Sequence, residues 1–288
     1  MNIKTPDMQE LLEAGSHFGH KVSRGNPGMK RYIFGARDGV HIIDLAKTEE
    51  LLKEAVAAAY EFGKMGKTLL LVGTKKQAQQ IVKDLAREAD SPFLADCWVG
   101  GLYTNFDEIR KNIKKLNDLK VAQSKGELSM YTKKEQLLIA RKLEKFNLQL
   151  GGVADLEKVP DGIFIIDAVS DNTAVKEANK LGVKVFGICD TNADPAWFDF
   201  PVPANDDGIK SIKLISESVI RAYIQGKKEA GVEQKVTEEP KETKVSKEKK
   251  TEEVKVENGL DKEIAEEAAV LEEEVEKKVL EESERKVE

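Results

Sequence analysis

The most regular hydrophobic pattern in the chain lies between residues 104 and 150. Apolar side chains recur there at alternating spacings of three and four, which is the pattern of a helix with one narrow apolar seam. Each half of the segment carries its own seam, formed by Phe106, Ile109, Ile113 and Leu116 in the first half and by Ile139, Leu143, Phe146 and Leu150 in the second. The pattern predicts two helices that pair as an antiparallel coiled-coil hairpin.

Local signals indicate where these two helices begin and where the chain turns between them. Asn105 with Glu108, and Thr132 with Glu135, have the spacing of a capping box. In this motif a short polar side chain and an acidic side chain close the first helical turn. Residues 124–126, with the sequence Ser-Lys-Gly, supply the turn that lets the helices fold back on each other.

Short apolar runs alternate with amphipathic stretches in the remainder of the first 228 residues, as is typical of a parallel sheet covered by helices. Strands are predicted at residues 40–43, 68–72, 93–95, 163–166 and 183–188. Helices are predicted at residues 7–17, 48–62, 74–89, 172–181 and 206–225. The fold class is therefore α/β, with a three-layer body of about five parallel strands made from residues 1–103 and 151–228. Residues 104–150 are inserted into this body as the hairpin.

The last part of the chain, residues 229–288, has a different composition. It is rich in Glu, Lys and Val with almost no aromatic residues, so it cannot bury enough apolar surface to offset its chain entropy. We expect this acidic tail to be largely disordered, with a marginal helix over residues 260–280. The tail has 12 Lys and Arg against 21 Asp and Glu, whereas residues 1–228 have 34 against 31 and are net basic.

The chain lacks the signals of secretion and of membrane insertion. The N-terminus has no apolar signal-peptide core, and no later stretch is long and apolar enough to span a bilayer. Cys97 and Cys189 stand far apart without a CxxC partner, which argues against a disulfide framework or a zinc knuckle. We expect a cytoplasmic protein with two free thiols and no membrane partner.

Residues 21–37 form a basic segment that contains no acidic residue. Tyr32 and Phe34 interrupt the charges, and several glycines and a proline predict a loop. Lysine and arginine can hold RNA phosphates, while glycines let the backbone approach a ligand closely. An irregular surface loop without a ligand is the alternative interpretation. The candidate phosphate-binding residues are Lys21, Arg24, Lys30, Arg31 and Arg37.

A second candidate phosphate site lies at residues 73–77, with the sequence Gly-Thr-Lys-Lys-Gln. Thr74 and Gln77 have capping-box spacing, which puts Lys75 and Lys76 in the first helical turn, where free backbone N–H groups and the helix dipole favour an anion. The hairpin adds eleven Lys and Arg against six Asp and Glu, a basic surface suited to a polyanion. Its candidate RNA-binding residues are Lys111, Lys114 and Lys115. Solvated lysines are the alternative in both places.

Enzyme motifs are weak in this sequence. Residues 63–68 resemble a P-loop but lack its first glycine and precede a strand, and no GxGxxG motif opens a helix. His17, His20 and several aspartates that follow strands, namely Asp167, Asp190, Asp194, Asp206 and Asp207, suit metal-assisted hydrolysis, although such residues more commonly cap helices and turns. Two alternatives stay open: a divalent ion at His20, Asp190 and Asp206, and a Rossmann-like enzyme that binds a phosphorylated metabolite at residues 73–77.

Taken in order, several motifs resemble the second protein of the bacterial small ribosomal subunit. The resemblance covers about residues 5–226. The motifs are residues 15–20 (GSHFGH), 26–45 (NPGMKRYIFGARDGVHIIDL), 72–78 (VGTKKQA), 98–101 (WVGG), 104–106 (TNF), 160–161 (PD), 189–195 (CDTNADP) and 203–207 (PANDD). The acidic tail lies outside the shared region.

The resemblance implies a flavodoxin-like body that carries a coiled-coil hairpin. It also implies a structural ribosomal protein in the cytoplasm that binds small-subunit ribosomal RNA between head and body and joins the subunit late in assembly. The implied protein partners are neighbouring small-subunit proteins, among them the large one that recruits messenger RNA. The resemblance implies neither catalysis, nor a required cofactor, nor a homo-oligomer.

Two positions depart from the family pattern. Cys97 stands where the family commonly has arginine, and Tyr103 stands where leucine is common. An arginine contact to RNA is therefore not expected at Cys97.

Overall fold

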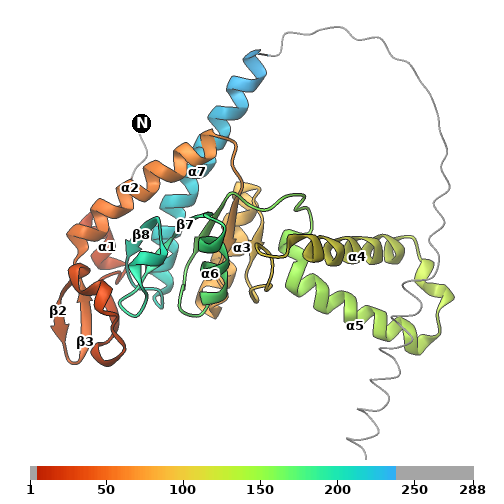
Figure 1. Ribbon diagram of the computed structural model, residues 1–288, viewed down its shortest axis with the longest axis horizontal. Helices are drawn as coiled ribbons and strands as arrows, with labels where there is room; N and C mark the ends of the chain where they lie inside the picture. The colour runs from red at the N-terminus through yellow and green to blue at the C-terminus, as the bar shows by residue number, and fades with distance from the viewer. Residues whose placement is uncertain (1–4, 238–288) are drawn as a thin grey trace, which may run out of the picture.

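A parallel sheet of five strands forms the centre of the molecule (Figure 1). The computed structural model describes residues 5–237. The strands lie in the order β5-β4-β6-β7-β8, so the sheet grows first to one side of β4 and then to the other. This is the flavodoxin-like order, and the predicted α/β fold class is confirmed. The strands are β4 (Leu69–Val72), β5 (Phe93–Leu94), β6 (Gly162–Ile165), β7 (Lys184–Cys189) and β8 (Phe200–Pro203).

Both faces of the sheet are covered, which produces three layers. Leu69 and Leu71 of β4 pack in one core cluster with α2, α3 and α7, whereas Leu70 and Val72 pack on the opposite face with α6 and the base of the hairpin. This alternation explains why the strand is apolar at every position. The helices of the body are α1 (Met8–Glu13), α2 (Leu45–Lys64), α3 (Lys76–Ala89), α6 (Asn172–Lys180) and α7 (Ile209–Thr237).

The fifth strand is not the one that the sequence predicts. Residues 40–43, predicted as a strand of the parallel sheet, form β3 (Val40–Ile43) in a separate antiparallel sheet. The fifth parallel strand is β8, whose sequence Phe-Pro-Val-Pro contains two prolines that argue against a strand. Proline lacks the N–H needed for a sheet ladder, but β8 lies at the sheet edge and pairs with β7 alone.

The two helices predicted for residues 104–150 are α4 (Phe106–Ser124) and α5 (Lys133–Leu150), which project from the body as one arm (Figure 1). The small antiparallel sheet lies at the opposite end of the molecule. Apolar residues of both predicted seams are buried, among them Ile109 and Ile113 on α4 and Ile139 and Leu143 on α5. Gly126, at φ 74°, makes the turn that follows α4, because a left-handed backbone favours glycine.

Only one of the two predicted capping boxes of the arm is present. At the start of α5 the hydroxyl of Thr132 accepts from the Glu135 N–H at 3.4 Å, and the Glu135 carboxylate accepts from the Thr132 N–H at 2.8 Å. The predicted box at Asn105 is wrong, because the Asn105 side chain makes no capping bond. The tight loop before α4 fixes the Asn105 backbone instead, through a 2.7 Å bond from its N–H to the Gly101 carbonyl.

Helix α7 continues well past its predicted end at residue 225 and reaches Thr237. The expected disorder from residue 229 is therefore wrong up to that point, since Lys, Glu, Gln and Ala there favour a helix. Lys227 also tethers α7 to the body by donating to the carbonyls of Ala89 and Asp90 at 3.0 and 2.8 Å. Residues 238–288, including the helix predicted at 260–280, lie outside the described residues.

Helices α2 and α7 approach each other closely through two glycines. A Cβ added at Gly63 would collide with the carbonyl oxygen of Tyr223, and one added at Gly226 would collide with that of Tyr60. The contact is reciprocal. Gly63 faces the backbone three residues before Gly226, and Gly226 faces the backbone three residues before Gly63. Alanine at either position must therefore push the helices apart.

We predict that Gly226→Ala lowers the free energy of unfolding by about 1–3 kcal/mol, the usual cost of overpacking a core. Urea denaturation followed by circular dichroism measures this loss. The matched control is Gly35→Ala, at a position where an added Cβ meets nothing within 4 Å. Equal stability of the two variants would contradict the close approach of α2 and α7.

Candidate nucleic-acid interface

The basic segment at residues 21–37 lies within an ordered antiparallel sheet of three strands. Its strands are β1 (Phe18–Lys21), β2 (Ile33–Arg37) and β3, with β3 in the middle. Two 3-10 turns, Val22–Arg24 and Pro27–Tyr32, connect β1 to β2. We call residues 18–43 the basic sheet. The prediction of a loop agrees with residues 22–32, which contain no strand, but is wrong for residues 33–37, which form β2 and pair with β3.

Short contacts fix the basic sheet to the carboxyl end of β7. The N–H of Asn26 donates to the Thr191 carbonyl at 2.7 Å, and the N–H of His20 donates to the Thr191 hydroxyl at 2.8 Å. Met29 is fully buried, with its sulfur 3.4 Å from that of Cys189. The basic sheet is therefore held firmly against the body.

The cations of the basic sheet all lie exposed on this rigid support. The guanidinium of Arg31 lies over the Tyr32 ring, 4.6 Å from its centroid, which limits the conformations of the arginine. Arg37 lies at the end of β2, 3.7 Å from the exposed carboxylate of Asp38. Such an exposed ion pair is weak and leaves the arginine accessible. The exposed cations are Lys21, Arg24, Lys30, Arg31 and Arg37.

The structure gives Lys75 a different role from the predicted phosphate contact. Its ammonium lies 3.0 Å from Asp167, 2.8 Å from Asp206 and 2.8 Å from Asp207, and its side chain is only 17% exposed. Burial alone lowers the pKa of Lys75, but the bonds from Asp206 and Asp207 raise it above its ordinary value. Lys75 is therefore a charged, partly buried partner of three aspartates.

The predicted capping box at Thr74 is also wrong. Helix α3 begins at Lys76, and Lys75 precedes it without a side-chain cap. The hydroxyl of Thr74 donates instead to Asp171 at 3.0 Å. Asp171 immediately precedes α6 and lies beside Thr74 in the fold. The two residues are far apart in the chain, so local spacing does not reveal this contact. Lys76 remains exposed in the first turn of α3.

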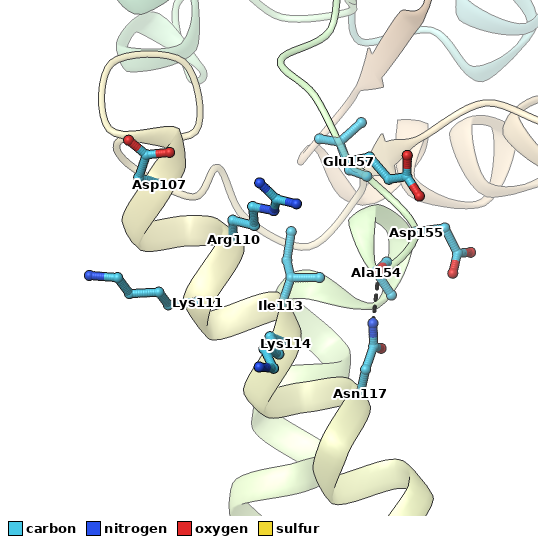
Figure 2. Close-up of a pocket in the computed structure, with 10 residues that line it drawn as sticks. Asp107, Arg110, Lys111, Ile113, Lys114, Asn117, Ala154, Asp155 and Glu157 are labelled. Carbon is cyan, nitrogen blue, oxygen red and sulfur yellow. Dashed lines mark hydrogen bonds between the residues drawn. The ribbon is translucent and has the colours of Figure 1, made fainter. Parts of the chain in front are cut away.

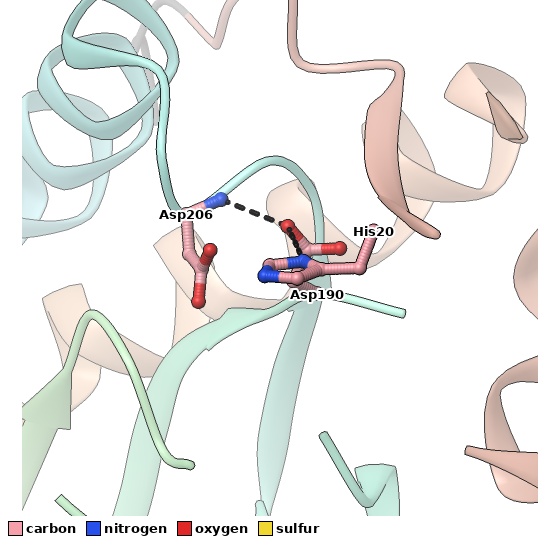
Figure 3. A group of neighbouring side chains, drawn as sticks. All are labelled: His20, Asp190 and Asp206. Atoms are coloured by element: carbon pink, nitrogen blue, oxygen red, sulfur yellow. Dashed lines mark hydrogen bonds and ion pairs between the residues drawn. The ribbon is translucent and has the colours of Figure 1, made fainter. Parts of the chain in front are cut away.

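His20 joins the same acidic cluster from β1 (Figure 3). Its Nδ1 atom lies 3.2 Å from Asp190, and its Nε2 atom lies 3.5 Å from Asp207. The hydrogen bond to Asp190 raises the pKa of His20, which favours the imidazolium. Burial, with Asp190 and Asp167 nearby, raises the pKa of Asp206 to about 7. His20, Asp190 and Asp206 offer one ligand atom each within 4.8 Å of one another, while His17 is not part of the group.

The net negative charge of this cluster argues against a phosphate-binding site. Parallel α/β sheets commonly bind ligands at the carboxyl ends of their strands, and this cluster occupies that edge. Lys75 and His20 face more carboxylates than they can neutralise, and these would repel a phosphorylated metabolite. The carboxylates are Asp167, Asp190, Asp206 and Asp207.

The arm presents its lysines in two settings. Lys115 lies half-buried on α4, whereas Lys111 and Lys114 line the groove shown in Figure 2, which has a volume of 830 Å³. The opposite wall carries the acidic residues Asp155 and Glu157. The ammonium of Lys111 also pairs with Glu108 at 2.6 Å. A phosphate backbone in this groove would therefore meet carboxylates as well as lysines.

Glu177 is a buried charge that sequence analysis does not single out. One carboxylate oxygen accepts from the Trp98 indole N–H at 3.3 Å and from the Gly101 N–H at 2.8 Å. The other accepts from the N–H groups of Tyr103 and Thr104, both at 3.2 Å, and from the Thr104 hydroxyl at 3.1 Å. Burial alone raises the pKa of Glu177, but these donors more than offset it, so the pKa is lowered.

The sequence contains one signal for Glu177. It shares a helical face with Ala174 and Ala178, which are buried, and an acidic residue on an apolar face needs a partner.

The structure also accounts for Tyr103, which is buried and donates through its hydroxyl to the Gly162 carbonyl at 3.3 Å. Cys97 is partly buried beside this loop, and burial raises the pKa of its thiol.

Comparison with known proteins identifies the family to which this fold belongs. The model of the family described as ribosomal protein S2 matches residues 11–226. The chain belongs to the ribosomal protein S2 family. Proteins named small ribosomal subunit protein uS2 are its relatives: one from Nitratiruptor is 45% identical over 220 residues, covering 76% of this chain and 82% of the relative. One from Wolinella succinogenes is 43% identical over 233 residues, covering 81% and 86%. One from Bacteroides fragilis is 45% identical over 224 residues, covering 78% and 81%.

Membership of the ribosomal protein S2 family confirms the predicted role in the small ribosomal subunit. The family consists of structural proteins of the cytoplasmic ribosome, so the protein is not an enzyme. The alternative of an enzyme for a phosphorylated metabolite is not supported, in agreement with the acidic cluster. Within residues 5–237, no helix combines the length and apolar character needed to cross a bilayer.

We predict that Lys75→Met lowers the free energy of unfolding by about 3–5 kcal/mol, because it leaves buried aspartates without their cation. Lys76→Met is the matched control, since Lys76 is the exposed neighbour and its loss should change stability by less than about 0.5 kcal/mol. Urea denaturation at neutral pH compares the two variants. A stable Lys75→Met protein would show that the ammonium is dispensable.

Proposed function

We propose that the basic sheet binds phosphates of small-subunit ribosomal RNA and fixes the protein in the subunit. The observation that carries this proposal is the exposure of Lys21, Arg24, Lys30, Arg31 and Arg37 on a sheet that is anchored to the body. An ordered backbone loses little conformational freedom on binding, and phosphate contacts position a protein on RNA without reading its sequence. Recognition is therefore of backbone shape, with little base readout.

Two further lysines extend this contact surface, and one candidate is withdrawn. Lys76 lies exposed at the start of α3, where backbone N–H groups favour an anion, and Lys115 adds charge on the arm. Lys75 is not included, because its aspartate partners already hold it. Lys111 and Lys114 contribute less than the cations of the basic sheet, because their groove also holds Asp155 and Glu157.

The protein acts in this proposal as a single copy within the subunit and not as a homo-oligomer. Its partners are ribosomal RNA and neighbouring small-subunit proteins, including the large protein that recruits messenger RNA. The separation of the basic sheet from the arm supports contacts with more than one neighbour (Figure 1).

We predict that charge reversal at Arg24, Lys30 and Arg31 weakens binding to small subunits that lack this protein, while the body stays folded. Each lost phosphate contact should reduce the slope of log affinity against log salt by about 0.7–0.9, so the triple variant should lose roughly 2–3 in slope. Quantitative binding across a salt series measures both effects.

A control for net charge comes from α7. Reversal at Lys210, Lys213 and Arg221, which are exposed on that helix, changes the net charge equally without touching the basic sheet. This control should retain the salt slope of the natural protein. Normal incorporation of the basic-sheet variant would remove that surface from the proposed function.

We also propose that His20, Asp190 and Asp206 can hold one divalent ion. Their ligand atoms lie within 4.8 Å of one another, and the surplus of aspartates favours added positive charge. Imidazole and carboxylate ligands suit a metal such as Zn²⁺. Because Asp206 also holds Lys75, the ion would share this carboxylate with the ammonium, so its role would be structural.

We predict that Zn²⁺ raises the melting temperature of the natural protein but not that of His20→Ala. At a free concentration a hundredfold above the dissociation constant, the stabilisation should be about 2–3 kcal/mol. A chelator should reverse the shift. His17→Ala is the control, since His17 lies outside the ligand group and should preserve the response. An identical response in both histidine variants would place the metal elsewhere.

A further inference from the structure

We infer that Glu177 is the positioning residue that fixes the direction in which the helical arm leaves the body. Glu177 belongs to α6, a helix of the body, and its carboxylate binds the loop that leads into α4. The loop residues Trp98, Gly101, Tyr103 and Thr104 all donate to this one side chain. The loop that leads into α4 is therefore bound to the body through one carboxylate.

The chemistry of this contact makes it strong and directional. Among residues 5–237, the structure records no ion pair between Glu177 and a lysine, arginine or histidine, so N–H and O–H donors alone satisfy its charge. Hydrogen bonds to an ionised acceptor are stronger than those to a neutral one. Five donors from a short loop arrive from different directions and leave the carboxylate little freedom to rotate. They hold the loop in one conformation.

The segment that follows α5 and returns to the body is also tightly packed. A Cβ added at Gly152, just after α5, would collide with the carbonyl oxygen of Phe93 on β5. Asn117 of α4 donates to the Ala154 carbonyl at 3.0 Å and ties the arm to the chain that leaves it (Figure 2). The segment after α5 stays packed against β5. If the loop before α4 loosens, the arm can therefore pivot about this packed segment.

Glu177→Gln is the sharpest variant because it keeps the length and shape of the side chain. An amide offers one acceptor oxygen, and its NH₂ group must face donors on the other side. Either Trp98 and Gly101 or Tyr103 and Thr104 would then lose their acceptor. Lys176→Gln is the matched control, an exposed position on the same helix.

The direction of the arm is measured as a distance between two spin labels by double electron–electron resonance. The labels are placed at Met130→Cys, which is 89% exposed near the end of the arm, and at Glu88→Cys, which is exposed on α3. The background carries Cys97→Ser, and the buried Cys189 is inaccessible to the label. The protein with Glu177 should give one narrow distance distribution, as should the Lys176→Gln control.

Glu177→Gln should broaden or shift this distribution while circular dichroism shows a folded body. An unchanged distribution would overturn the inference. If Glu177→Gln does not fold, Thr104→Val removes one donor with little change in volume and should broaden the distribution to a smaller extent. A Thr104→Val distribution that matches the reference would then count equally against the inference.

A second measurement links the direction of the arm to binding, and this part rests on the proposed function. If the loosened arm adopts the bound direction a tenth of the time, affinity for small subunits lacking the protein falls about tenfold. The salt slope should stay unchanged, because no phosphate contact is lost. A Glu177→Gln protein with normal affinity would show that the direction of the arm does not matter there. Failure of the unsubstituted protein to bind would count against the proposed function alone, since the distance measurement needs no ribosome.

Discussion

The ammonium group of Lys75 holds together the carboxyl edge of the central sheet. It follows β4 and contacts Asp167, which follows β6, and Asp206 and Asp207, which follow β8. His20 extends the same network to Asp190, at the end of β7, and so connects it to β1. The position of the basic sheet relative to the body therefore depends on buried charge, in addition to the packing of Met29.

This arrangement explains how a fold that often binds small ligands can serve as a scaffold. Flavodoxin-like sheets leave a crevice where the strand order reverses, and ligands commonly bind there. Here the residues that follow β4, β6, β7 and β8 close the edge against one another and against β1. The family match and the charge of the edge agree, because a surface rich in aspartate does not suit a phosphate, whereas the exposed cations lie on the outer sheet.

Sequence reasoning succeeded where a pattern was local and regular. The seams of α4 and α5, the buried strand β4 and the cap at Thr132 follow directly from spacing, because neighbouring residues determine them. The family resemblance identified the fold order and the ribosomal role. Sequence reasoning failed at β8, where prolines hide an edge strand, and at Lys75, whose partners lie more than ninety residues away in the chain. Glu177 was missed for the same reason, since its donors come from an earlier loop.

The distance between the basic sheet and the arm changes how binding energies combine. The two lie at opposite ends of the molecule, so attachment of one end presents the other to its neighbour at a high effective concentration (Figure 1). Under the proposed function, two individually weak contacts then give avidity without a large interface at either end. Such avidity depends on both ends engaging together, which makes the stiffness of the body as important as the contacts themselves.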